Sequence, residues 1–133
     1  MEPIVYTATK STPRVHFDAQ EKIFRMVGES YPENAFAFYE PLLRWIEQYL
    51  VEMQGDMILE LQLTYLNTSS TRCMLTLFDR LDVAFQQGTV VEIRWYYHPD
   101  DDRSLEAAEE FKEDLSVPFN IIMSIDATED TKQ

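Results

Sequence analysis

Two patterned segments that follow each other directly limit what this chain can fold into. Residues 57–66, MILELQLTYL, alternate, so that Leu59, Leu61, Leu63 and Tyr65 face one way and polar residues face the other. This alternation predicts a β-strand with one buried side. Residues 70–86 then carry a helical stripe of apolar side chains, namely Met74, Leu77, Phe78, Leu81, Ala84 and Phe85. A strand that runs straight into an amphipathic helix is typical of an α/β fold.

The same alternation of strands and helices continues on both sides of this unit. Strands are expected at 4–9, 14–18, 22–29, 89–98 and 117–126, with Ile23 and Met26 facing inward in the third. A loop at 98–103 leads into an acidic helix that carries Leu105, Ala108 and Phe111. The order β-β-β-α-β-α-β-α-β predicts one α/β domain over residues 1–126, with a mixed sheet and helices packed on it. A flexible tail is expected at 127–133.

The first helix has a marked expected start near residue 30. Ser30 and Glu33 stand three residues apart, which fits a capping box, and Pro32 fits the first turn. Pro41 falls inside the helical pattern, which predicts a kink or a separate first turn. Gly55 is expected to end the segment.

Charge and cysteine content exclude several classes of function. The chain has 24 acidic and 11 basic residues and a net charge of −13, which argues against nucleic acid and anionic membrane surfaces as partners. Cys73 is the one cysteine in the 133 residues, so no internal disulfide forms, and we expect a core or semi-buried thiol in a cytoplasmic protein. We see no signal peptide and no apolar run of the roughly 18 residues that a membrane span needs.

A search for catalytic chemistry finds little. Three glycines in the whole chain leave no glycine-rich phosphate loop, and the two histidines, His16 and His98, stand far apart in sequence. The acidic run Asp100–Asp102 could bind a cation weakly, but it suits the N-terminus of a helix better. We therefore expect no metal, no cofactor and no catalytic residue.

A row of uncharged hydroxyl residues stands at the junction of the strand at 57–66 and the helix at 70–86. It consists of Thr68, Ser69, Ser70 and Thr71 and follows Asn67. One of these residues can cap the helix by accepting a backbone N–H bond, which leaves the others spare and exposed. The carboxyl edge of an open α/β sheet is where ligands bind. The row is therefore either a cap with spare neighbours or a regulatory site, because a phosphate there would add about −1.5 to −2 charges.

Four blocks of sequence, in order, resemble the SiaC family of bacterial regulatory phosphoproteins. They are GESYPENAFAFYEPLLRWIEQYL, LTYLNTSS, VVEIRWYYHPDDD and AAEEFKEDLSVPF. The resemblance implies a fold like that of the anti-sigma-factor antagonists and no catalysis by this chain. It implies a kinase that phosphorylates Thr68 in the NTSS motif and a metal-dependent serine/threonine phosphatase that removes the phosphate. The unphosphorylated form would bind and activate a diguanylate cyclase, which raises cyclic di-GMP and promotes aggregation and biofilm formation.

The resemblance assigns the partner-binding residues by position and leaves one signature without a role. Asn67, Thr68, Ser69 and Ser70 match the NTSS motif, while the SYPEN motif at 30–34 matches a second signature with no assigned contact. An uncharged row can lie against a partner at little desolvation cost, whereas a phosphate on Thr68 cannot. Two alternatives stay open: an antagonist that sequesters an anti-sigma factor, and a small metal-dependent enzyme that uses Asp100–Asp102.

Overall fold

The computed structural model describes residues 1–124, and its elements follow the predicted order. The strands are β1 (Ile4–Tyr6), β2 (Arg14–Phe17), β3 (Ile23–Ser30), β4 (Met57–Leu66), β5 (Val91–Tyr97) and β6 (Phe119–Met123), and the helices are α1 (Ala35–Glu52), α2 (Thr68–Gln86) and α3 (Asp102–Glu113). The expected tail at 127–133, and the last two residues of the expected domain, lie outside the described residues. Within the described ones, no helix has the length and hydropathy needed to cross a membrane.

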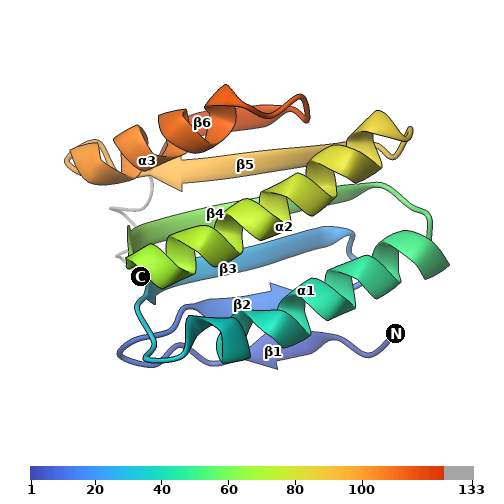
Figure 1. The fold of residues 1–133 in the computed structure, drawn as a ribbon, viewed down its shortest axis with the longest axis horizontal. Coiled ribbons are helices and arrows are strands. Elements are labelled where there is room, and N and C mark those ends of the chain that lie inside the picture. The colour runs from blue at the N-terminus through green and yellow to red at the C-terminus, as the bar shows by residue number, and fades with distance from the viewer. Residues whose placement is uncertain (125–133) are drawn as a thin grey trace.

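The strands form one mixed sheet in sequence order, β1-β2-β3-β4-β5-β6 (Figure 1). The pairs β1/β2 and β2/β3 are antiparallel, whereas β3/β4, β4/β5 and β5/β6 are parallel. Each parallel pair is joined by one helix. Because such crossovers are right-handed and all three step across the sheet in the same direction, the three helices must cover the same face. Figure 1 shows them together on that face.

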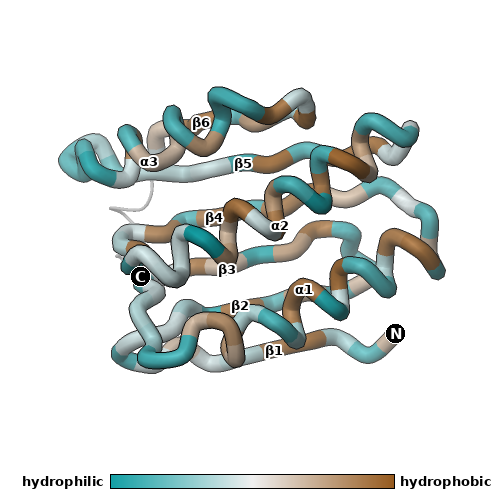
Figure 2. Tube along the Cα trace, in the orientation of Figure 1, coloured by the Kyte–Doolittle hydropathy of each residue, from teal (hydrophilic) through white to brown (hydrophobic). Residues whose placement is uncertain are grey.

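The hydrophobic core lies between the helices and this covered face. Its strand residues include Val15, Phe17, Phe24, Met26, Leu59, Leu61, Leu63, Val91, Ile93 and Trp95, all buried. The predicted stripe of α2 is confirmed: Met74, Leu77, Phe78, Leu81 and Ala84 are buried, and Phe85 is partly buried against the core. Figure 2 shows hydrophobic residues recurring along α1 and α2 and within the strands.

The opposite face of the sheet carries no helix in the described part of the chain, and a network of charged side chains lies on it. Glu60 accepts hydrogen bonds from Arg25 at 3.1 Å and from Arg94 at 3.3 Å. Arg94 also donates to Glu92 at 3.0 Å, and the Asn120 amide donates to Glu92 at 2.7 Å. The Arg94 hydrogen bond holds the pKa of the Glu92 carboxyl below its usual range. These bonds link four neighbouring strands into one ladder, which we call the charged ladder.

The expected start of the first helix is wrong. Ser30 is the last residue of β3, and α1 begins at Ala35 after an N-cap at Asn34, whose side chain accepts a bond from the Ala37 N–H at 3.1 Å. Parallel pairing with β4 holds Ser30 opposite Leu66, so the strand continues through the residue that the capping-box pattern favoured. Pro41 lies inside one unbroken helix, so the expected separate first turn is also wrong.

Two predictions of inward-facing strand residues need correction. In β3 the buried apolar residues are Phe24 and Met26, so Met26 faces inward as predicted, while Ile23 is partly exposed. In β4 Leu59, Leu61 and Leu63 are buried as predicted, but Tyr65 is 45% exposed. A register shift between Gly28 and Glu29 skips Thr64 and brings Glu29 opposite Tyr65, so the regular alternation ends before the strand does.

Candidate functional site

The hydroxyl row lies where β4 ends and α2 begins, and Asn67 joins the two. The Asn67 side chain accepts a hydrogen bond from the Ser70 N–H at 2.8 Å, and its carbonyl accepts the Thr71 N–H at 2.9 Å. Its own N–H donates to the Ser30 carbonyl at 3.0 Å. Asn67 is therefore the N-cap of α2, which was one of the predicted possibilities, and it ties the helix start to the end of β3.

The row divides into exposed and buried members. Thr68 and Ser69, the first two helical residues, are exposed, whereas Ser70 is fully buried. Thr71 is half-buried, and its hydroxyl donates to the Asn67 carbonyl at 3.0 Å. The expectation that all spare hydroxyls are exposed is therefore wrong for Ser70. In this conformation Ser70 offers a partner no surface, and its role is to support the helix start.

Ser70 belongs to a buried network of three hydroxyl groups. Its oxygen lies 2.8 Å from the Ser30 oxygen, which lies 2.7 Å from the Tyr39 oxygen. Burial raises the pKa of Tyr39 to about 12, because the charged tyrosinate would be desolvated. The network joins β3, α1 and α2 directly beneath Thr68 and Ser69. A neutral, mutually bonded set of groups in this place holds the exposed residues on a fixed frame.

The SYPEN signature, which had no assigned role, forms the other half of this site. Ser30 contributes to the buried network, and the Tyr31 ring meets Tyr65 edge-on, with the ring centroids 5.9 Å apart. Asn34 caps α1. Residues 30–34 and 67–70 thus lie side by side at the carboxyl ends of β3 and β4. Parallel pairing of the two strands produces this contact between segments far apart in sequence.

Helix α2 separates two surface hollows beside the row. A groove of about 640 Å³ lies between α2 and α3, and α2 contributes Thr71 and Leu75 to it. A smaller hollow of about 340 Å³ lies between α2 and the start of α1, with Ser69, Arg72, Cys73 and Thr76 from α2. We call these the α2–α3 groove and the α1–α2 groove. Burial raises the pKa of the Cys73 thiol, which disfavours the reactive thiolate.

The two exposed hydroxyl residues lie on different faces of α2: Ser69 lines the α1–α2 groove, and Thr68 lines neither groove. Positions i, i+3 and i+7 lie on one face of a helix, so Thr68 continues the stripe of Thr71 and Leu75. Ser69 by the same spacing continues the stripe of Arg72 and Thr76, and it lines the α1–α2 groove directly. Thr68 therefore stands at the end of the α2–α3 groove, about 10 Å along the helix axis from Leu75.

The acidic run Asp100–Asp102 has structural duties at the start of α3. The Asp101 side chain accepts the Ser104 N–H at 3.1 Å as the N-cap, and Asp102 lies in the first turn. Asp100 is paired with His98 across 3.7 Å. Among the described residues, the run is not part of any three-residue group with metal-ligand spacing. Its geometry fits the helix-start interpretation.

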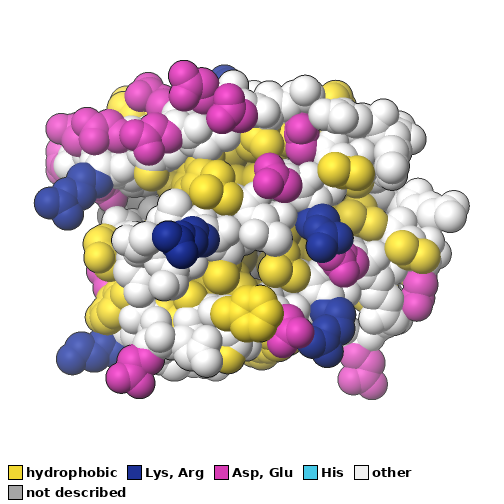
Figure 3. Space-filling view, viewed as in Figure 1, with side chains coloured by type: hydrophobic (Ala, Val, Ile, Leu, Met, Phe, Trp, Pro, Cys, Tyr) yellow, Lys and Arg dark blue, Asp and Glu magenta, His cyan; other side chains and the backbone are white. Residues whose placement is uncertain are grey.

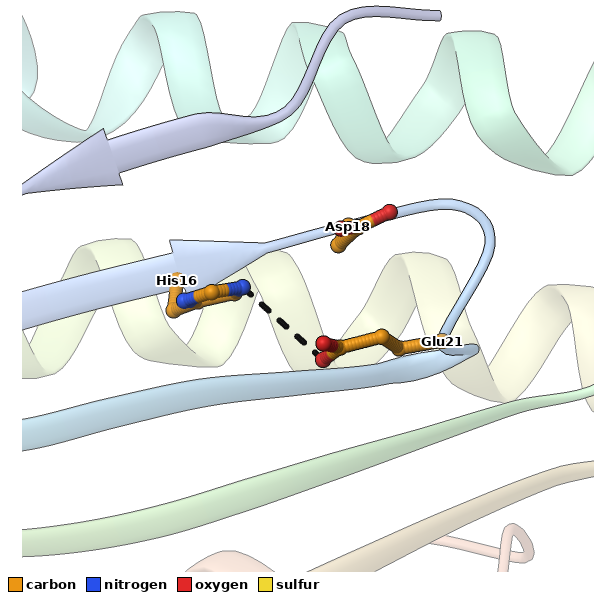
Figure 4. Close-up of side chains that lie close together, drawn as sticks. All are labelled: His16, Asp18 and Glu21. Atoms are coloured by element: carbon orange, nitrogen blue, oxygen red, sulfur yellow. Dashed lines mark ion pairs between the residues drawn. The ribbon is translucent and has the colours of Figure 1, made fainter.

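One cluster with metal-ligand spacing does occur, at the turn between β2 and β3. His16, Asp18 and Glu21 place one ligand atom each within 4.8 Å of one another. Figure 4 shows His16 and Glu21 facing each other, with His16 Nε2 and Glu21 Oε1 3.8 Å apart. However, Glu21 also pairs with Arg25 at 3.6 Å, and Asp18 accepts the Gln20 N–H at 2.9 Å within the turn. The three side chains therefore have partners within the turn, which lies at the other end of β3 from the hydroxyl row.

Sequence reasoning missed Ser30 and Tyr39 as members of the site. The sequence pattern predicts a helix cap at Ser30 and gives Tyr39 no role in the site. A signal did exist: the SYPEN and NTSS motifs both belong to the resemblance, yet nothing local linked them. Only the parallel pairing of β3 with β4 puts Ser30 under Ser70, 40 residues later.

Comparison with known proteins gives consistent results. A model of the "SiaC family regulatory phosphoprotein" matches residues 6–124. An uncharacterized protein of Pseudomonas aeruginosa strain UCBPP-PA14 is 40% identical over 121 residues, which is 91% of this chain and 96% of that protein. The solved structure of SiaC of Pseudomonas aeruginosa is also 40% identical and has a TM-score of 0.87, covering 92% of this chain and 99% of that one.

A second solved structure adds a partner for that relative. It is a crystal structure of the diguanylate cyclase SiaD in complex with its activator SiaC from Pseudomonas aeruginosa. The SiaC chain in it has a TM-score of 0.87 and 40% identity to this chain, covering 90% of this chain and 98% of that one. The family match over nearly all of the described residues and the 40% identity lead to one conclusion: this chain belongs to the SiaC family of regulatory phosphoproteins.

Proposed function

We propose that this chain is a phospho-regulated binding protein that, when unphosphorylated, binds and activates a diguanylate cyclase. Phosphorylation of Thr68 blocks this complex. The observation that carries the proposal is the position of Thr68: it is exposed as the first residue of α2, above a buried frame to which its side chain contributes no hydrogen bond. The cyclase partner is supported by the structure of a 40% identical relative bound to one.

The geometry supports regulation at the surface rather than by unfolding. The contacts that hold the start of α2 come from Asn67, Ser70 and Thr71, so a phosphate on Thr68 breaks none of them. It would add about −1.5 to −2 charges at a helix N-terminus, where negative charge is favourable. A partner that packs on Thr68 would have to desolvate that charge, which is costly. The modification therefore blocks the partner while the domain stays folded.

The remaining parts of the proposal come from family membership. A serine/threonine kinase adds the phosphate and a metal-dependent serine/threonine phosphatase removes it, in the cytoplasm. Activation of the cyclase raises cyclic di-GMP and promotes biofilm formation. We propose no catalysis by this chain. In support, the Ser70 and Thr71 hydroxyls bond to the buried frame and to a backbone carbonyl, and no hydrogen bond in residues 1–124 joins a hydroxyl of the row to a carboxylate or imidazole that could activate it.

The direct experiment titrates the purified chain, before and after kinase treatment, into the candidate diguanylate cyclase by calorimetry. Mass spectrometry on the same samples maps the phosphate. We expect binding by the unmodified chain alone, a phosphate on Thr68, and a Thr68→Ala variant that binds the cyclase and resists the kinase. Ser69→Ala is the matched control and should still accept the phosphate.

Two outcomes would contradict the proposal. Equal binding by both forms would remove Thr68 as the regulatory residue for this partner. Binding to an anti-sigma factor, with no binding to the cyclase, would favour the antagonist alternative instead.

A further inference from the structure

The α2–α3 groove exposes hydrophobic surface at the edge of the molecule. Its floor includes Leu63 of β4, Trp95 of β5 and Phe111 of α3, and its rim includes Tyr65 and Leu75, each 45% exposed. Figure 3 shows hydrophobic side chains between the two helices on the face seen there. Large half-exposed apolar side chains around a hollow mark a surface that another molecule covers.

The groove has an acidic surround. Its rim carries Glu29 and Glu110 against one basic residue, Arg103. On the outer side of α3, Glu106, Glu109, Glu110 and Glu113 gather around Lys112. Figure 3 shows this concentration of acidic side chains over α3. A partner with a complementary, basic flank would be favoured here over a neutral or acidic one.

The position of the groove in the sheet selects the kind of partner element. It lies over β4 and β5, and each of these strands is paired on both sides. The β4/β5 pairing ends at Leu61 and Trp95, and beyond it the start of α3 lies against β4, where the Ser104 hydroxyl donates to the Leu63 carbonyl at 3.2 Å. An added strand would meet α3 there. The side walls are two helices with an apolar floor between them, which is the arrangement that accepts the apolar face of a helix.

We infer that the α2–α3 groove binds a basic amphipathic helix of the cyclase, with apolar side chains against Leu75 and cationic side chains toward α3. This inference rests on the proposed function and names the surface that performs it. It also explains why Thr68 is the regulated residue. Thr68, Thr71 and Leu75 share one stripe, so a phosphate on Thr68 stands at the mouth of the groove. A phosphate on Ser69 would face the α1–α2 groove instead.

The test uses the full chain and the full-length cyclase in calorimetric titrations. We expect Leu75→Asp to weaken binding by at least about tenfold, because it places a charge where the apolar face of the partner helix would pack. The matched control is Val83→Asp: Val83 lies on the same helix and is 51% exposed, but it does not line the groove. It should change the affinity by less than about twofold. Circular dichroism and urea unfolding should show both variants folded.

A second variant tests the charge on the rim independently. Glu110→Lys should weaken binding several-fold at low salt and reduce the dependence of the affinity on salt concentration. Its side chain is exposed on α3, so the fold does not depend on it.

The outcomes separate this inference from the proposed function. Failure of the wild-type chain to bind the cyclase would overturn both. Wild-type binding that Leu75→Asp leaves unchanged would overturn the groove alone. If sedimentation shows a wild-type dimer that Leu75→Asp converts to a monomer, with cyclase binding intact, the occupant is a second copy of this chain and the inference is wrong.

Discussion

The starts of α2 and α3 are built alike and differ at one functional point. In each, an Asn or Asp side chain caps the helix by accepting the N–H of a buried serine three residues later: Asn67 with Ser70, and Asp101 with Ser104. Each serine hydroxyl then bonds into the core, Ser70 to Ser30 and Ser104 to the Trp95 indole at 2.9 Å. Between cap and serine, however, α3 has Asp102 and α2 has Thr68.

This difference explains the uncharged row. The first helical position favours negative charge, and α3 carries a permanent one in Asp102, whereas the first turn of α2 has no acidic residue. Phosphorylation of Thr68 would supply there, reversibly, a charge that the fold already accommodates at the equivalent position of α3. The row is thus suited to carry or lack a charge without strain on the domain.

The largest expected difference between the two helix starts appears at high pH. The network under α2 contains the titratable Tyr39, whose pKa is about 12 in the folded chain and 10.0 ordinarily, while the group under α3 is a tryptophan. The folded state therefore disfavours tyrosinate, so this contribution is intact below pH 10 and is lost as the pH rises toward 12. A shift of two pKa units corresponds to about 2.7 kcal/mol of unfolding free energy at full titration.

Urea unfolding of wild type and Tyr39→Phe between pH 9 and 11.5 checks this. The slope of stability against pH should be smaller in the variant. It should not vanish, because burial also raises the pKa of Tyr49. Equal slopes in the two proteins would show that Tyr39 ionises freely and that the buried network is loose.

Removal of the serine hydroxyl should destabilise the α3 start more than the α2 start. Ser104→Ala leaves the buried Trp95 N–H without its acceptor and should lower the unfolding free energy by about 2 kcal/mol. Ser70→Ala should cost about 1 kcal/mol, because Ser30 and Tyr39 still bond to each other. Urea denaturation at pH 7 measures both, and a greater loss in Ser70→Ala would contradict the network as described.

Removal of the two caps should lower the unfolding free energy by similar amounts in α2 and α3. Asn67→Ala and Asp101→Ala each delete the side-chain acceptor of one serine N–H and should cost about 1 kcal/mol. Asp101→Ala should be the more sensitive to salt, since it also removes a charge near the helix dipole. Thermal unfolding at two salt concentrations provides the comparison. If the difference in stability between the two variants does not change with salt, the caps act through hydrogen-bond geometry and not through charge.

The smallest expected effect concerns the charge itself. Thr68→Asp should raise the unfolding free energy by about 0.3 to 1 kcal/mol, and Asp102→Asn should lower it by a similar amount. Ser69→Asp, also in the first turn, should stabilise α2 like Thr68→Asp yet leave cyclase binding nearly intact. Thermal unfolding and calorimetry measure the two properties separately. Destabilisation by Thr68→Asp would mean that the charge acts on the fold after all.

Much of the fold was predictable because its signals are local. The alternation of β4, the stripe of α2 and the cap at Asn67 all depend on neighbouring residues. The start of α1 was not predictable, because Ser30 and Glu33 match a capping box while pairing with β4 holds Ser30 in a strand. Ser104 was likewise missed: the pattern pointed to Leu105, but Ser104 is buried because it links the Trp95 indole to the Leu63 carbonyl at 3.2 Å.

The site was predictable only in its exposed half. The exposure of Thr68 and Ser69 was predicted from the sequence, while the burial of Ser70 depends on contacts with Ser30 and Tyr39 across 40 and 31 residues of chain. Hydroxyl side chains give no sequence signal for burial, since the same residues serve in loops, caps and cores.

The charged ladder on the uncovered face of the sheet has a consequence for how the sequence of this family can change. Glu60 accepts hydrogen bonds from Arg25 and Arg94, and Arg94 also donates to Glu92, so every charged side chain in the ladder has a partner of opposite charge. A single substitution there leaves a charged side chain without its partner, whereas a simultaneous change of both partners does not. Among related sequences, these positions should therefore vary together, strand with strand, while Leu75 and its stripe should vary with the partner protein.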